Sequence, residues 1–114
     1  MRVDVEEPLF NVFTNEPFNF SGKNATLRMA LVAALLGNYG DLESVDYAEK
    51  CYRFKLAQRI NNPDVDEIDL SQQDISLVKR LIGMHYIPVV VGAIDSILTS
   101  GEFTLVTNNE KSPT

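Results

Sequence analysis

The stretch LSQQDI, residues 70–75, carries the signals that mark the start of a helix. Ser71 is a good N-cap residue, and Asp74, three positions later, can bond back to the cap as the acid of a capping box. Leu70 and Ile75 occupy the two positions that pair as a hydrophobic staple. The stretch therefore predicts a helix that begins directly after Ser71, and it fixes the phase of the apolar residues that follow.

Downstream of this start, apolar residues continue at helical spacing and predict a helix over 72–86. One row holds Ile75, Val78, Ile82 and His85, and the adjacent row holds Leu77, Leu81 and Met84. Pro88 breaks the chain and suits the first turn of a further helix over Pro88–Thr99. The run Val89–Val91 could instead be a buried strand, but the apolar residues after it keep helical spacing, which favours a helix.

Upstream, the segment Ala25–Leu36 is apolar on nearly all sides, which is typical of a helix that is central or that faces two partners. Asn24 can cap its start, and Gly37 or Gly40 can end it. The predicted helix Pro88–Thr99 is similarly apolar. Because a small chain can surround only one such helix, we expect another copy or a partner protein to cover part of this surface.

A fourth helix is predicted over Asp46–Ile60, where Asp46 and Glu49 have capping-box spacing. It is the one basic element of the chain, through Lys50, Arg53, Lys55 and Arg59. Three interpretations stay open for this face. It can be a solvated surface with internal pairs such as Glu49–Arg53, it can pair with the acidic segment 64–69 of the same or a neighbouring subunit, or it can contact a nucleic-acid backbone.

The N-terminal segment Met1–Phe20 has a β-like or irregular pattern. Leu9–Phe13 and Phe18–Phe20 flank Thr14–Pro17, which has turn chemistry, and together they predict a short hairpin. We expect the phenylalanines of this region to cover a helical core rather than to stack on bases, because aromatic side chains usually contribute buried area. They are Phe10, Phe13, Phe18 and Phe20.

The predicted fold class is α+β and mainly α: one compact four-helix domain over residues 1–107 with a short N-terminal β-hairpin. Phe103–Val106 is a possible C-terminal strand that would pair with the N-terminal segment, and residues 108–114 are expected to form a disordered tail. A chain of 114 residues with 45% apolar and 23% charged residues suits one soluble domain with one core.

Composition limits the chemistry. The net charge of −6 argues against broad binding of nucleic acid, and the lone Cys51 allows neither an internal disulfide nor, with His85 as the only histidine, a Cys/His zinc site. We expect no cofactor, no metal and no catalytic residue. The N-terminus does not resemble a signal peptide, and no apolar run reaches membrane-spanning length, so we expect a cytoplasmic protein without membrane contact.

Surface positions on the predicted helices are the candidate interaction residues. They are Tyr47, Lys50, Tyr52, Arg53, Lys55, Arg59, His85 and Val90. A rival hypothesis is a nucleic-acid-binding regulator that uses the basic face of helix 46–60. A second rival is a small-ligand-binding oligomer whose pocket, between subunits, is lined by Tyr47, Tyr52 and Arg53.

Four motifs carry a resemblance: TLRMAL at Thr26–Leu31, YRFKLA at Tyr52–Ala57, DISLVKRLIG at Asp74–Gly83, and VVVG at Val89–Gly92. This layout, over Leu9–Leu98, resembles small proteins of tailed bacteriophages and prophages. The resemblance implies a phage-associated origin and brings no catalytic residue with it. The expected function is that of a non-enzymatic accessory protein that self-associates and binds another phage or host protein, in particle assembly or against a host factor.

Overall fold

Helix α3 (Gln72–His85) begins where the sequence predicts it. In the computed structural model, which describes residues 1–39 and 46–99, the Ser71 hydroxyl accepts a hydrogen bond from the Asp74 backbone N–H at 3.0 Å. The Ser71 N–H in turn donates to Asp74 Oδ2 at 3.0 Å, which completes the capping box. Leu70 and Ile75 are both buried, as the staple requires. The helix start is confirmed in each of these parts.

Helix α1 (Leu27–Leu36) begins two residues later than predicted. Its N-cap is Thr26, whose hydroxyl accepts from the Met29 N–H at 3.4 Å, and the prediction of Asn24 as the cap is wrong. Asn24 lies in a strand instead, because the chain there is still paired as a hairpin. Gly37 ends the helix in an extended conformation, and Gly40 lies outside the described residues.

Helices α2 (Tyr47–Ile60) and α4 (Pro88–Leu98) match their predicted ranges to within a residue. The Asp46 carboxylate caps α2 by accepting from the Glu49 N–H at 2.9 Å. Pro88 occupies the first turn of α4, where its missing N–H has no helical partner to lose. The valine run after it is helical, so the strand alternative for this segment is wrong.

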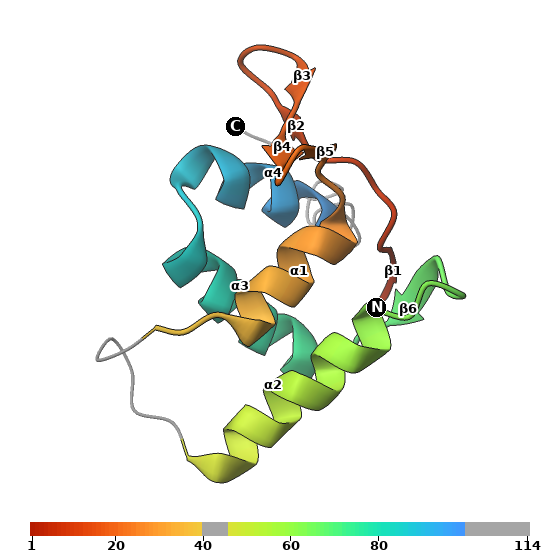
Figure 1. Cartoon of the computed structure of the whole chain (residues 1–114), viewed down its shortest axis with the longest axis vertical. Helices are drawn as coiled ribbons and strands as arrows, with labels where there is room; N and C mark the ends of the chain where they lie inside the picture. The colour runs from red at the N-terminus through yellow and green to blue at the C-terminus, as the bar shows by residue number, and fades with distance from the viewer. Residues whose placement is uncertain (40–45, 100–114) are drawn as a thin grey trace, which may run out of the picture.

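Helix α1 lies at the centre of the described residues and packs against α2 and α3, while α4 packs against α3 and strand β2 (Figure 1). The apolar sides of α1 and α4 are largely buried within the one chain. The buried residues are Leu27, Ala30, Leu31, Ala34 and Leu35 in α1, and Val90, Ala93, Ile94 and Leu98 in α4. Because α2 and α3 cover α1, and α3 and β2 cover α4, the expectation that a partner is needed to cover these two helices is wrong.

Strand β1 (Arg2–Asp4) pairs antiparallel with β6 (Glu67–Asp69), with Val3 opposite Ile68 in the core. The acidic segment 64–69 thus contains a strand that the sequence analysis did not predict. Its carboxylates are compensated by the N-terminal strand: Arg2 Nε lies 3.0 Å from Glu67 Oε1, and the terminal amine lies 3.3 Å from Asp69 Oδ1. The predicted strand 103–106 and tail 108–114 lie outside the described residues.

Two small hairpins follow β1. Strands β2 (Phe10–Asn11) and β3 (Glu16–Pro17) form the first, and β4 (Asn19–Phe20) and β5 (Lys23–Asn24) form the second. A hairpin in this region is confirmed, but its predicted pairing is wrong: Glu16 and Pro17 form the second strand, and Asn19 and Phe20 pair with β5 instead. Leu9 joins the two, because its N–H donates to Ala25 O and its carbonyl accepts from the Phe18 N–H, both at 3.0 Å. The described residues are mainly helical with short antiparallel strands, as the predicted fold class requires.

Arg28 of α1 ties the helices to the strands. Its Nε donates to Ile60 O at 2.9 Å and its Nη2 donates to Asn62 O at 3.0 Å, so it satisfies carbonyls at the end of α2. The same guanidinium also bonds Val65 O and the carboxylate of Glu6. A single side chain therefore sets the position of α1 relative to both the α2–β6 loop and the N-terminal segment.

Candidate interaction surfaces

A polar network at the start of α3 takes up two of the candidate residues. The Tyr52 hydroxyl donates to Asp74 Oδ1, and Arg59 Nη1 lies 3.6 Å from Asp74 Oδ2. Burial alone would raise the pKa of the Asp74 carboxyl, but the hydrogen bonds from Tyr52 and Ser71 and the charge of Arg59 together lower it. Arg59 also donates to Asp69 O at 2.7 Å. Tyr52 and Arg59 therefore brace α2 against α3.

Glu49 occupies a second polar cluster on the same side of α2. Its carboxylate accepts from Arg80 Nη2 at 2.8 Å and from Arg53 Nε at 3.0 Å. The hydrogen bond from Arg80 lowers the pKa of Glu49, burial opposes this effect, and Arg53 lowers the pKa further. The predicted Glu49–Arg53 pair is confirmed. Arg53 is buried, so the expectation that it contacts a partner is wrong.

The basic face of α2 is consequently divided. Arg53 and Arg59 bond to groups of their own chain, whereas Lys50 and Lys55 are exposed beside Tyr47, of which 84% is exposed. Phe54 also points outward with 54% exposed, whereas Cys51 is half-buried. The outer side of α2 therefore presents two lysines in place of the four cations that the sequence suggested for contact with a nucleic-acid backbone.

The small-ligand pocket predicted from Tyr47, Tyr52 and Arg53 is not formed by one chain. At 3.6 residues per turn these side chains leave α2 on three different sides. Tyr47 faces solvent, Tyr52 faces Asp74, and Arg53 faces the helix core. Within one chain the three residues do not line a common surface, and a pocket between subunits stays a prediction.

His85 belongs to an aromatic cluster at the end of α3. Its ring packs edge-on against Tyr86 with centroids 4.6 Å apart, and Tyr86 stacks on Phe20 at 5.8 Å with an interplanar angle of 7°. The Tyr39 hydroxyl donates to Ala34 O at 2.5 Å and lies 3.3 Å from His85 Nδ1.

This cluster forms one wall of an open groove of about 480 Å³, which we call the aromatic groove. Residues of the β4–β5 hairpin, of the outer side of α1 and of the end of α3 contribute to it. The lining consists of Asn19, Phe20, Ser21, Met29, Ala33, His85 and Tyr86. His85 is the only predicted interaction residue that lines this groove. That Phe20, Met29 and Tyr86 also line it was not predicted from the sequence.

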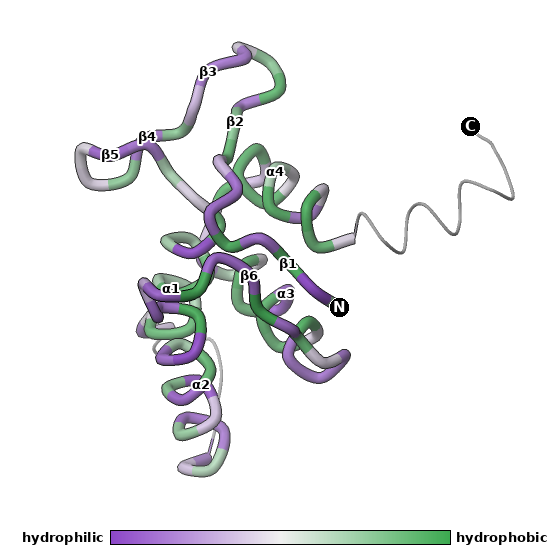
Figure 2. The backbone as a smooth tube through the Cα atoms, turned by 90° about the vertical axis from the view of Figure 1, so that its right-hand side faces the viewer, coloured by the Kyte–Doolittle hydropathy of each residue, from purple (hydrophilic) through white to green (hydrophobic). Residues whose placement is uncertain are grey.

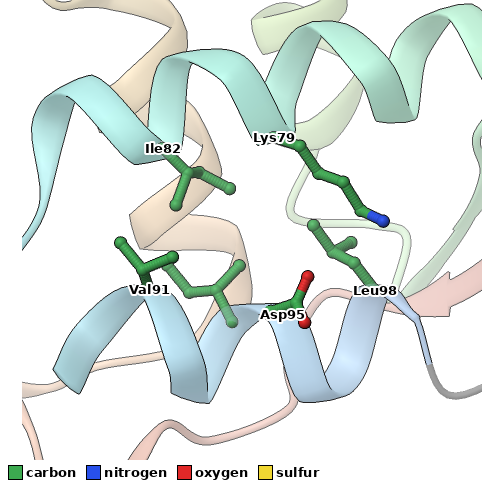
Figure 3. Close-up of a pocket in the computed structure, with 6 residues that line it drawn as sticks. Lys79, Ile82, Val91, Asp95 and Leu98 are labelled. Carbon is green, nitrogen blue, oxygen red and sulfur yellow. The ribbon is translucent and has the colours of Figure 1, made fainter. Parts of the chain in front are cut away.

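Val90 contributes to no surface. It is 6% exposed and packs in the core beside a small cavity between α3 and α4, so its predicted role in contact is wrong. The cavity has a volume of about 70 Å³. Figure 3 shows Lys79 and Ile82 from α3 facing Val91, Asp95 and Leu98 from α4. The cavity has room for a few water molecules, since each water molecule needs roughly 10–15 Å³ of cavity volume.

The loop between β2 and β3 presents two strongly exposed apolar side chains. Phe13 is 85% exposed and Val12 is 77% exposed. The loop is ordered by its ends: Asn11 Oδ1 accepts from the Phe13 N–H at 2.8 Å, and Asn11 O accepts from the Asn15 N–H at 2.7 Å. Figure 1 shows the loop projecting away from the helices, and Figure 2 shows its β2 side coloured hydrophobic. We call residues 12–15 the hairpin tip.

The hairpin tip was not predicted from the sequence, because all four phenylalanines were expected to cover the core. Phe18 and Phe20 do pack against the core, as predicted, but Phe10 and Phe13 are exposed. A signal was present in the asparagines at positions 11 and 15, one directly before the four-residue loop and one at its last position. Asn readily bonds to nearby backbone and adopts left-handed conformations, so such a bracket indicates a tight turn whose central side chains cannot reach the core.

Residues 1–39 and 46–99 contain no group of three or more His, Cys, Asp or Glu side chains placed to hold a metal ion. Over the same residues, no helix combines the length and the apolar character that crossing a bilayer demands.

Comparison of the chain with protein-family models, with curated proteins and with solved structures finds no match.

Proposed function

We propose that this chain is a non-enzymatic accessory protein that acts by binding protein surfaces, including that of another copy. The observation that carries the proposal is the hairpin tip, where an ordered loop holds Val12 and Phe13 in solvent. Exposing large apolar side chains on an ordered loop is unfavourable for an isolated domain, and it is typical of a surface that docks into a partner.

The order of the tip strengthens this interpretation. Asn15 has a φ of 60°, in the left-handed region, and its N–H closes the loop on Asn11 O. A loop that is fixed before binding loses less conformational entropy when it docks. Aromatic side chains that enter a partner's pocket also dominate the energetics of many interfaces. The tip therefore has the physical properties of a binding element rather than of a simple connection.

The resemblance to proteins of tailed bacteriophages supplies the setting of the proposal. In that setting the partner is another phage protein, during particle assembly, or a host protein in the cytoplasm. The polar clusters on α2 and α3 support a binding role over a catalytic one, because their polar groups already bond within the chain. Tyr52 bonds Asp74, and Arg53 bonds Glu49.

A photo-crosslinking amino acid placed at position 13 tests the proposal in the cells that express the protein. We expect a specific crosslinked protein, either a second copy or a different polypeptide, identified by mass spectrometry. The matched control carries the same amino acid at position 58, which is exposed on α2. Equal crosslinking patterns at positions 13 and 58, or no crosslink at position 13, would contradict a binding role for the tip.

A further inference from the structure

We propose that the hairpin tip of one copy docks into the aromatic groove of a second copy, and that a two-fold dimer makes this contact twice. The inference rests on the proposed function and names its partner as another copy of this chain. It joins two features that the fold places near each other: the most exposed aromatic side chain of the described residues, Phe13, and a groove walled by Phe20 and Tyr86.

The placement of the two features allows the contact to be reciprocal. The tip belongs to the β2–β3 hairpin and the groove to the β4–β5 hairpin, and both hairpins lie at the same end of the molecule (Figures 1 and 2). A tip and a groove at one end can be exchanged by a single two-fold rotation, so each copy gives and receives one tip. Such an isologous contact closes on itself and does not propagate into a filament.

The groove suits an aromatic guest. Phe20 and Tyr86 provide stacked rings, and Met29 provides a thioether, which makes favourable contacts with aromatic rings. The volume of about 480 Å³ leaves room for the Phe13 ring together with the Val12 side chain. Burying an aromatic ring in this way removes roughly 150–250 Å² from water for each partner that contributes one.

Charge complementarity points to a second copy rather than to an unrelated partner. Between Pro8 and Leu27 the sequence contains one acid, Glu16, and one base, Lys23. Glu16 lies opposite Asn11 at the base of the tip, and Lys23 lies opposite Phe20 at the edge of the groove.

Both side chains are exposed, and neither takes part in an ion pair within residues 1–39 and 46–99. The tip is therefore acidic at its base and the groove is basic at its rim. When a tip enters the groove of another copy, the two charges attract across the contact. The two-fold rotation repeats this pairing, so the arrangement is self-complementary in charge as well as in shape.

The size of the contact sets its strength. Two tips with their grooves bury less than the roughly 1,200 Å² at which stable interfaces begin. We therefore expect a weak dimer that forms at high micromolar protein concentration, as the encounter complexes of other small proteins do. The tip and the aromatic groove are the whole of this proposed contact, and the dimer needs no further surface.

Sedimentation equilibrium of the full chain over a wide concentration range, at low salt, tests the proposal. We expect the wild-type protein to dimerise and Phe13→Ser to raise the dissociation constant about tenfold or more, as loss of an interface anchor does. Phe54→Ser is the matched control, because it removes an exposed phenylalanine from α2, and we expect it to leave the dimer unchanged. Circular dichroism and urea unfolding confirm that each variant is folded.

Charge reversal makes the test specific. Glu16→Lys and Lys23→Glu should each weaken the dimer about fivefold, and the double variant should restore it, because the pair is re-formed with opposite signs. A monomeric wild-type protein at the highest concentration, insensitivity to Phe13→Ser, or a failure of the double variant to restore the dimer overturns the inference. If the wild type is monomeric while position 13 still crosslinks to a different protein in cells, the proposed function stands and the second copy as partner is excluded.

Discussion

The two N-terminal hairpins contain similar residues, but their phenylalanine side chains lie in different surroundings. Both join two-residue strands, and both contain Phe next to Asn. In the β4–β5 hairpin, Phe20 packs against the core and stacks on Tyr86. In the β2–β3 hairpin, Phe13 lies in the loop and is 85% exposed. The length of the turn accounts for the difference.

The β4–β5 loop has two residues, Ser21 and Gly22, both with positive φ, so the strands stay short and close to the helices. The β2–β3 loop has four residues, and its asparagine bonds lift the central side chains away from the chain's own core. The β4–β5 hairpin therefore adds an aromatic side chain to the core, whereas the tip of the β2–β3 hairpin leaves Phe13 in solvent. Substitutions that separate these two roles test this division.

The largest expected difference is between Phe20→Ala and Phe13→Ala. We expect Phe20→Ala to lower the free energy of unfolding by about 2 kcal/mol, less than the full loss at a completely buried phenylalanine because Phe20 is half-buried. Phe13→Ala should change it by less than about 0.5 kcal/mol, since the side chain is in solvent. Urea unfolding at pH 7 measures both. Equal losses would show that the tip also supports the core.

Tyr86→Phe removes a hydroxyl from beneath the β4–β5 hairpin while keeping the ring that stacks on Phe20. The Tyr86 hydroxyl donates to Ala30 O at 2.9 Å, so its loss should lower the free energy of unfolding by about 1 kcal/mol. Phe20 keeps its stacking partner, and we therefore expect the hairpin to stay in place. Urea unfolding gives the free energy, and a much larger loss would indicate that the ring itself had moved.

The same hydroxyl predicts a dependence on alkaline pH. Burial, with a smaller contribution from Tyr39, raises the pKa of Tyr86 from 10.0 to about 12. Below pH 10 the phenol is protonated in both folded and unfolded chains, and its contribution is complete. Above pH 10 the unfolded chain loses the proton first, so stability falls until the folded phenol ionises near pH 12. Unfolding measured from pH 9 to pH 12 should fall less steeply in Tyr86→Phe than in the wild type.

Much of the helical structure could be predicted from the sequence because its signals are local. Ser71 and Asp74 act over one turn of helix, Pro88 can occupy only a first turn, and the rows on α3 follow directly from its phase. The strand pair β1–β6 could not be found in the same way. Val3 and Ile68 are 65 positions apart, and neither segment by itself indicates its partner.

The candidate surfaces were predicted less well than the helices, for a related reason. Arg53 and Arg59 look like surface cations in the sequence, but their fate depends on Glu49, Arg80 and Asp74, which approach only after α2 and α3 pack. Charge on a helix face indicates exposure only when no other element brings an opposite charge to it. The prediction for Phe13 failed in the opposite way. Its aromatic ring was expected to be buried, because the direction that the loop gives to this side chain was not considered.

Asn15 is where that constraint on the hairpin tip can be changed. Its φ of 60° is in a region that Asn tolerates and Ala resists, so Asn15→Ala should destabilise the closed loop by roughly 0.5–1 kcal/mol. Asn15→Gly should leave it closed. Hydrogen exchange of the residue 15 amide, which donates to Asn11 O, measures the closure directly. If exchange is unchanged in Asn15→Ala, the exposed conformation of Phe13 does not depend on this turn.

The smallest expected effect is a gain of stability in the other hairpin. Ser21 and Gly22, with φ of 54° and 83°, have the positive φ values of a type I′ turn, in which Asn-Gly is preferred over Ser-Gly. Ser21→Asn should therefore raise the free energy of unfolding by roughly 0.3–0.5 kcal/mol, since Asn accepts the left-handed conformation more readily.

Ser21→Ala is the matched control. It should lower stability, because the methyl group of alanine cannot form the local hydrogen bonds that favour this conformation. Unfolding midpoints of the two variants should thus move in opposite directions, while hydrogen exchange at the residue 15 amide stays the same in both. Such a result would show that the two turns act independently of each other. The β4–β5 turn belongs to the structure that folds the domain, and the β2–β3 turn shapes a loop that the core does not use.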